Sequence, residues 1–130
     1  MKIHLVSLLL LVFAGCEGSL LHTASLSPEE LALVSDEQLC KAYAYKHSDK
    51  LRSEIESRQL FSEDEWQAIE KQSIFVGMSE LAMKASISGL IFDGMLSDAR
   101  GTLYRWRMLG TSVRAYIYTA DGKVVTYEMF

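Results

Sequence analysis

The side chains with the strongest nucleophilic chemistry in this sequence are the thiols of Cys16 and Cys40. A catalytic cysteine needs a base within hydrogen-bond reach. His22 stands alone in a Ser- and Thr-containing stretch, and His47 lies about two helical turns from Cys40, too far for a catalytic pair. No Cys-x-x-Cys, His-Glu-x-x-His, Gly-x-Ser-x-Gly or phosphate-binding glycine motif occurs. We therefore expect no enzyme activity, cofactor or metal ion. Cys40 is expected to be buried in a helix, with a reactive or interchain-bonded thiol as the alternative.

The carboxylates that stand closest together are those of Glu63, Asp64 and Glu65. Paired carboxylates can act as a general acid and a general base. These three residues, however, directly follow Ser62, and a serine followed three positions later by glutamate is a capping box at a helix start. Acidic side chains in a first helical turn are also favoured by the helix dipole. We therefore interpret this cluster as the beginning of a helix.

The residues before Cys16 predict how its thiol is used. Lys2 is followed by an apolar run from Leu5 to Phe13 and by the small pair Ala14-Gly15, which is the pattern of a secretion signal. The run is too short to span a bilayer, which takes about 20 apolar residues. Its end at Cys16 resembles the lipobox of bacterial lipoproteins. An ordinary secretory peptide with an accidental cysteine is the alternative.

The lipobox resemblance implies that the chain is cut before Cys16 and that the Cys16 thiol carries diacylglycerol. Glu17, rather than aspartate, follows the cysteine, which in this class implies transport to the outer membrane. The segments expected at this end are a signal peptide at 1–15 and a lipidated tether at 16–26, since the latter shows no sustained hydrophobic period.

The charge of the chain excludes one class of partner. It carries 13 Lys and Arg against 17 Asp and Glu, a formal net charge of -4, with no basic stripe. Nucleic-acid phosphates require clustered basic side chains. We therefore expect no nucleic-acid partner, and residues 27–130 have the size of one domain.

Local capping chemistry predicts helices between residues 27 and 87. Serines that can cap a helix stand at Ser27, Ser35, Ser48, Ser62 and Ser79, each before a segment with apolar residues at helical spacing. Residues 86–101 are rich in Gly, Ser and Asp and are expected to form a long loop.

Residues 102–130 predict the sheet. Apolar and polar residues alternate over 102–108 and again over 113–119, and the Asp121-Gly122 pair favours a tight hairpin before a last strand at 124–130. The predicted fold is therefore α+β, with N-terminal helices packed on a C-terminal three-stranded antiparallel meander.

One face of this meander is the candidate binding site. If the alternation holds, five arginines and tyrosines point away from the helices: Arg105, Arg107, Arg114, Tyr116 and Tyr118. Tyr and Arg dominate the hot spots of protein interfaces. The alternative is that these side chains only cover a solvated sheet and stack across its strands.

Three features of the C-terminal half together resemble a known family. They are Val76-Gly77-Met78-Ser79 before the last helix, Trp106 in the first predicted strand, and Asp121-Gly122 followed by Val124-Val125-Thr126. This layout is similar to the BamE/SmpA/OmlA group of small outer-membrane lipoproteins, whose fold is like that of β-lactamase-inhibitor protein. The resemblance implies a non-enzymatic lipoprotein on the periplasmic side of the outer membrane that binds an envelope protein in assembly or maintenance. The alternative is an inhibitor or immunity lipoprotein that blocks one envelope enzyme or effector.

Overall fold

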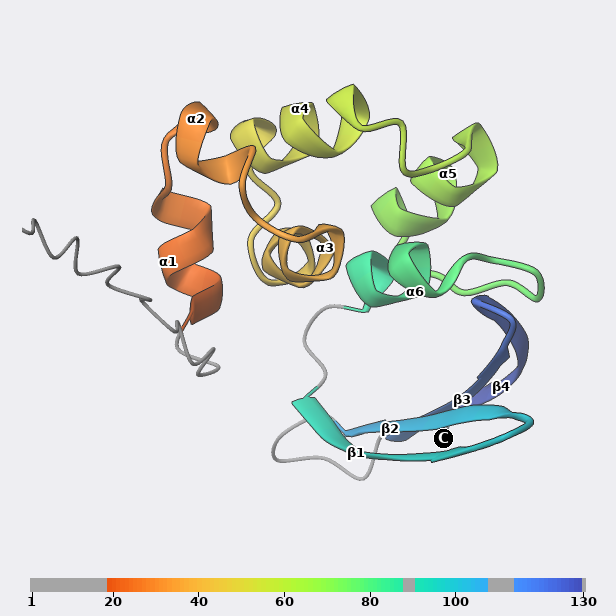
Figure 1. Cartoon of the computed structure of the whole chain (residues 1–130). Coiled ribbons are helices and arrows are strands. Elements are labelled where there is room, and N and C mark those ends of the chain that lie inside the picture. The colour runs from red at the N-terminus through yellow and green to blue at the C-terminus, as the bar shows by residue number, and fades with distance from the viewer. Residues whose placement is uncertain (1–18, 88–90, 108–113, 130) are drawn as a thin grey trace, which may run out of the picture.

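The described part of the chain forms an α+β fold in which helices cover one side of an antiparallel sheet (Figure 1). The computed structural model describes residues 19–87, 91–107 and 114–129. The helices within these ranges are α1 (Ser19–Ser25), α2 (Pro28–Leu31), α3 (Asp36–Tyr45), α4 (Asp49–Ser57), α5 (Glu63–Glu70) and α6 (Glu80–Ser86). The strands are β1 (Ile91–Asp98), β2 (Gly101–Arg107), β3 (Arg114–Ala120) and β4 (Lys123–Met129), side by side in the order β1-β2-β3-β4.

The five predicted helix starts are confirmed. The hydroxyl of each capping serine accepts a hydrogen bond from the backbone N–H three residues later, at 3.2–3.3 Å. At Ser27 and Ser62 the glutamate at that third position also accepts a bond from the backbone N–H of the serine, which completes a capping box. Local capping therefore decides where α2 to α6 begin.

The predicted loop at 86–101 is wrong over residues 91–98, which form strand β1, so the meander has four strands. A β-bulge between Phe92 and Gly94 breaks the two-residue alternation by which a strand is recognised. The connection to β2 is a tight turn in which the Asp98 carboxylate accepts hydrogen bonds from the backbone N–H groups of Arg100 and Gly101, at 2.8 and 3.3 Å.

The predicted tether at 16–26 is wrong over residues 19–25, which form α1. Leu20 and Ala24, four residues apart, pack against the core, and Thr23 is buried. The Thr23 hydroxyl accepts a hydrogen bond of 3.2 Å from the side-chain amide of Gln38 on α3. The helix is too short to form alone. Packing on α3 therefore stabilises it, and the folded domain includes residues 19–25.

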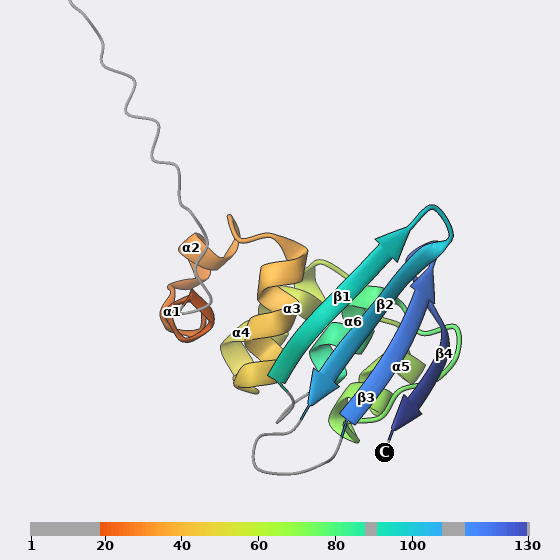
Figure 2. The same cartoon turned by 90° about the horizontal axis from the view of Figure 1, so that it is seen from below.

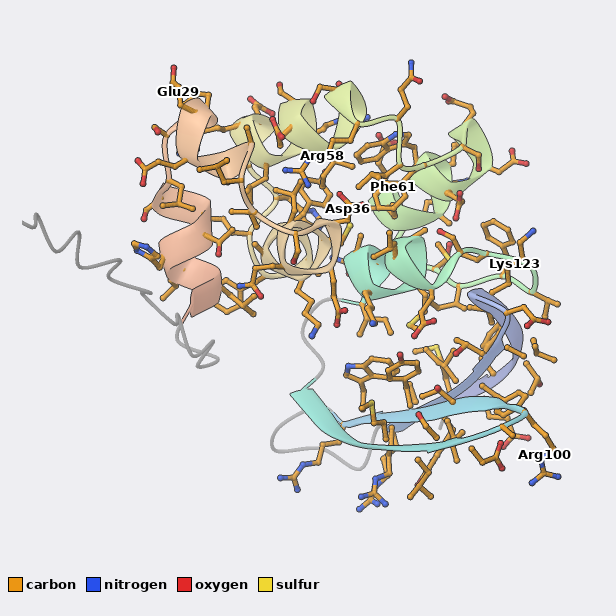
Figure 3. All side chains as sticks on the ribbon, in the orientation of Figure 1. Glu29, Asp36, Arg58, Phe61, Arg100 and Lys123 are labelled. Carbon is orange, nitrogen blue, oxygen red and sulfur yellow. The ribbon has the colours of Figure 1, made fainter. Side chains whose placement is uncertain are left out.

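Arg58, which follows α4, holds the first helices together (Figure 3). Its guanidinium donates hydrogen bonds of 2.8 Å to the backbone oxygens of Leu31 and Val34 and to the Asp36 carboxylate. A fourth bond, of 2.9 Å, goes to Glu54. The carbonyls at the end of α2 have no partners within that short helix. Arg58 therefore ties the end of α2 to α3 and α4.

The core fills the space between α3, α6 and the sheet, and α4 and α5 add their apolar sides. It is one connected cluster, whose fully or almost fully buried members include Leu39, Tyr43, Leu51, Ile55, Ile69, Met78, Met83, Tyr104, Trp106 and Ile117. Met78 and Met83 are both completely buried in this cluster.

The entry to α6 joins the helical layer to the sheet. The Gly77 N–H donates to the carbonyl of Val124, and the Val124 N–H donates to the carbonyl of Met78, both at 2.8 Å. The Glu80 N–H adds a 2.9 Å bond to the carbonyl of Gly122. Gly77 has a φ of 93°, which a residue with a side chain adopts only under strain. Gly77 therefore forms the turn into α6, the Met78 side chain is buried in the core, and Ser79 caps the helix as predicted.

One carboxylate connects this junction to α5. Oε1 of Glu65 accepts from the Ser62 N–H at 3.1 Å, and Oε2 accepts from the Ser79 N–H at 2.8 Å. Partial burial opposes ionisation of Glu65, but the hydrogen bonds from Ser79 and Ser62 outweigh it and lower the pKa of the carboxyl. Glu65 therefore acts as a structural cap at two helix starts.

We predict that Glu65→Gln lowers the free energy of unfolding at pH 7 by about 1–2 kcal/mol, because it removes the charge from two hydrogen bonds. A carboxyl whose folded-state pKa is lowered stabilises the protein above its unfolded-state pKa, about 4.3. That stability is lost as the pH falls through the folded-state pKa. Denaturant titrations at several pH values should show that the difference in the free energy of unfolding between wild type and Glu65→Gln becomes smaller as the pH falls below the unfolded-state pKa. Glu63→Gln, an exposed neighbour in the same turn, is the control; a gap that does not change with pH would contradict the assignment.

Candidate functional site

The five predicted partner-binding residues lie together on the face of the sheet that points away from the helices. Arg105 and Arg107 alternate along β2 with the buried Tyr104 and Trp106. On β3, Arg114, Tyr116 and Tyr118 alternate with Ala115, Ile117 and Thr119, which are buried. Figure 2 shows this face from below, with no described helix over it. The predicted placement is confirmed, whereas a binding role stays a prediction.

Strand register groups the five residues into one patch, which we call the outward patch. Arg105 is paired with Tyr116, and Arg107 with Arg114. Like charges directly opposite each other weaken a strand pair. This register places the guanidinium groups of Arg105, Arg107 and Arg114 near one end of the sheet, although the formal net charge of the chain is -4.

Two glycines give the long side chains of the outward patch room to lie flat. A Cβ placed on Gly94 of β1 would lie 3.3 Å from Nη2 of Arg105. A Cβ on Gly101 would lie 2.9 Å from the hydroxyl of Tyr118 and 2.2 Å from the carbonyl oxygen of Thr119. Arg105 and Tyr118 therefore reach across the neighbouring strands. Sequence reasoning missed both glycines, although glycine inside a strand is a signal of close approach.

Exposed apolar side chains on the neighbouring strand extend the outward patch. Leu96 of β1 is paired with Leu103, which in turn is paired with Tyr118, so the three side chains form one row across the sheet. Leu96 is 74% exposed. A mixture of aromatic, arginine and aliphatic side chains is typical of the centre of a protein interface. Sequence reasoning missed Leu96 because β1 was expected to be a loop.

A polar cluster on the opposite side of β2 fixes the sheet against α6 and α3. The Tyr104 hydroxyl hydrogen-bonds to the Glu80 carboxylate. Nζ of Lys84 lies 3.2 Å from Glu37 and 3.7 Å from Glu80, and 5.2 Å from the centre of the Tyr104 ring. Only 11% of the Lys84 side chain is exposed. In the sequence, Glu80 and Lys84 have the spacing of an ordinary surface pair, so their role between the layers could not be foreseen.

The Cys40 thiol is placed for packing. It is fully buried in α3, and burial raises the pKa of the thiol to about 12, with the Asp36 carboxylate adding to the effect. The ring of His47 stacks on Tyr43, with 4.6 Å between ring centres. A thiol with this pKa is protonated at neutral pH and is therefore a weak nucleophile.

In the ranges that the structure describes, no group of three or more His, Cys, Asp or Glu side chains could hold a metal ion. Cys16, the predicted lipidation site, lies outside the described residues. Among the helices that are described, none is both long and apolar enough to cross a membrane.

Comparison with known proteins gave no significant match to a protein-family model, a curated protein or a solved structure. The resemblance to the BamE/SmpA/OmlA group therefore stays a prediction.

We predict that Cys40 of the folded protein reacts with iodoacetamide at pH 8 more than about a hundredfold more slowly than a free thiol, because its thiolate is rare and its sulfur is covered. Peptide mass spectrometry can follow this site separately from Cys16. Urea should restore the free-thiol rate. Tyr45→Cys, at a 60% exposed position of the same helix, is the matched control. If Cys40 were labelled without urea as fast as the cysteine introduced at this exposed position, its thiol would be reactive.

Proposed function

We propose that this chain is a non-enzymatic lipoprotein, anchored by Cys16 at the periplasmic side of the outer membrane, that binds a protein partner of the cell envelope. The lipobox-like end of the apolar run at Cys16 supports the address. The observation that carries the binding role is the outward patch, in which five arginine and tyrosine side chains share the face that no described helix covers.

The backbone under the outward patch favours binding. Its residues lie on β2 and β3, the two inner strands of the sheet, so each strand is held by hydrogen bonds on both sides. A surface that is ordered before association loses less conformational entropy when a partner arrives. The polar cluster of Tyr104, Glu80 and Lys84 adds to this order from the helix-covered side of the sheet.

The charge of the outward patch indicates the kind of partner surface. Arg107 and Arg114 face each other across the strand pair, with Arg105 beside them. A carboxylate-bearing surface can form bidentate hydrogen bonds with guanidinium groups. We therefore expect an acidic surface on the partner, and an association rate that falls with increasing salt.

The proposed anchor predicts the mass of the mature chain. Mass spectrometry of the protein isolated from cells should find a chain that begins at Cys16 and carries a diacylglyceryl group and an N-acyl group on that residue. Cys16→Ser should leave the uncut precursor, because the modifying enzymes need the thiol. A mature chain without Cys16, or with unmodified Cys16, would overturn the proposed address.

If the outward patch binds the partner, substitutions within it should weaken binding. We expect Arg107→Ala with Tyr116→Ala to lower recovery of the crosslinked envelope partner at least about tenfold, since hot-spot residues each contribute about 2 kcal/mol or more. Crosslinked affinity purification from cells measures this.

The matched control is Tyr45→Ala with Lys46→Ala, which removes one ring and one positive charge from exposed positions of the helical layer. Recovery should be unchanged in this control, and circular dichroism should show that both double variants are folded. Equal recovery of the partner by wild type and by both double variants would show that the outward patch does not bind it. A captured partner that is an enzyme inhibited by the chain would favour the inhibitor alternative.

A further inference from the structure

Helix α1 is the described element nearest in sequence to the proposed lipid on Cys16. Three peptide links separate Cys16 from Ser19 and reach about 10 Å at most. Leu21 is two residues further along the helix, so its Cα stays within about 16 Å of that of Cys16. The polar headgroup region on each side of a bilayer is about 5–7 Å thick. An acylated Cys16 therefore brings Leu21 within reach of the lipid headgroups.

The side of α1 that faces away from the folded body is uncharged. Leu20 and Ala24 pack against the core. Leu21 and Ser25, four residues apart and therefore on one face of the helix, are both exposed, and 59% of Leu21 is accessible. Residues 18–28 contain no Asp, Glu, Lys or Arg, and this is the longest such stretch of the expected mature chain. The exposed side of α1 can therefore enter a lipid interface without removing a charge from water.

We propose that the exposed side of α1 lies against the phospholipid surface of the membrane that holds the Cys16 lipid, with the Leu21 side chain below the headgroups. The inference rests on the proposed lipoprotein anchor and adds a second, non-covalent lipid contact to it. Apolar side chains of a helix that lies on a membrane are buried about 5–10 Å deep, at the boundary between headgroups and acyl chains.

Two features of the chain lower the cost of this contact. Packing on α3 holds α1 in its helical form before it meets lipid, so little conformational entropy is lost on contact. A lipid on Cys16 also makes the contact intramolecular, which gives α1 a high effective concentration of bilayer surface. A single leucine, which would not hold a soluble protein on a membrane, can therefore orient a chain that is already anchored.

The contact would orient the whole domain, since α1 is fixed to the folded body. Figures 1 and 2 both show α1 on the opposite side of the molecule from the turn between β1 and β2. This turn would therefore point away from the bilayer. Ala99 lies in the turn and is exposed, so it is a suitable position for a control label.

Fluorescence quenching in vesicles tests the contact. The lipidated full chain with Ser25→Cys would be labelled with a maleimide fluorophore, which does not react with acylated Cys16 or buried Cys40. The vesicles would consist of phosphatidylethanolamine and phosphatidylglycerol with a nitroxide-bearing lipid as quencher. We expect quenching of this label to be at least about threefold stronger than that of the same label on Ala99→Cys, because only α1 would lie at the depth of the acyl chains.

Flotation of the vesicles tests the anchor separately from the α1 contact. A chain that floats with the vesicles but is quenched equally at the two labelled positions would overturn the contact and leave the anchor in place. A chain that does not float would overturn both.

The part played by the Leu21 side chain is tested in the same assay. Leu21→Glu should lower the quenching of the Ser25→Cys label nearly to that of the Ala99→Cys label, because a carboxylate is costly to bury among acyl chains. Leu33→Glu is the matched control, since it makes the same change at a leucine that follows α2 and is 88% exposed. It should leave the quenching unchanged, and circular dichroism should show that both variants are folded. Quenching lowered equally by both substitutions, or by neither, would overturn the proposal.

Discussion

The backbone pairing between the entry to α6 and the β3–β4 hairpin determines how the two layers meet. Gly77, Met78 and Val124 are joined by backbone hydrogen bonds of 2.8 Å, and the side chain of Met78 is fully buried. Buried N–H and C=O groups are destabilising unless they are paired, so this strand end and this helix start stabilise each other. Glu65 extends the connection by accepting the N–H of Ser79. Because the junction fixes which side of the sheet faces the helices, it also fixes which side carries the arginines and tyrosines.

Features of the fold that depend on neighbouring residues could be predicted from the sequence. Serine caps act within one helical turn, so Ser27 and Ser62 were sufficient to locate α2 and α5. The hairpin between β3 and β4 is likewise a local matter, and Asp121 and Gly122 have the positive φ values of 52° and 73° that their type of turn requires. Features decided by distant contacts could not be predicted. Helix α1 exists because of its packing on α3, and the bulge hides the period of β1.

The candidate site also has some features that could be predicted from the sequence and others that could not. Alternation along two strands predicted the direction of all five side chains in the outward patch, because one face of an antiparallel sheet must be buried. The residues that support the outward patch from neighbouring elements could not be predicted. Gly94 matters because Arg105 comes from the next strand, and Lys84, which is nearly buried, contacts Glu37 of α3 and the ring of Tyr104 on β2. The fold alone names no activity, so the functional argument depends on these particular side chains.

The docking of α1 on α3 has a mechanical consequence for a lipid at Cys16. Ser19 already belongs to the folded body, and the three peptide links from Cys16 to Ser19 can reach about 10 Å at most. So short a connection would hold the domain close to the bilayer surface and would restrict its rotation. Encounters with another envelope protein would then depend on lateral diffusion at one fixed height above the lipid headgroups, and a target far out in the periplasm would be beyond reach.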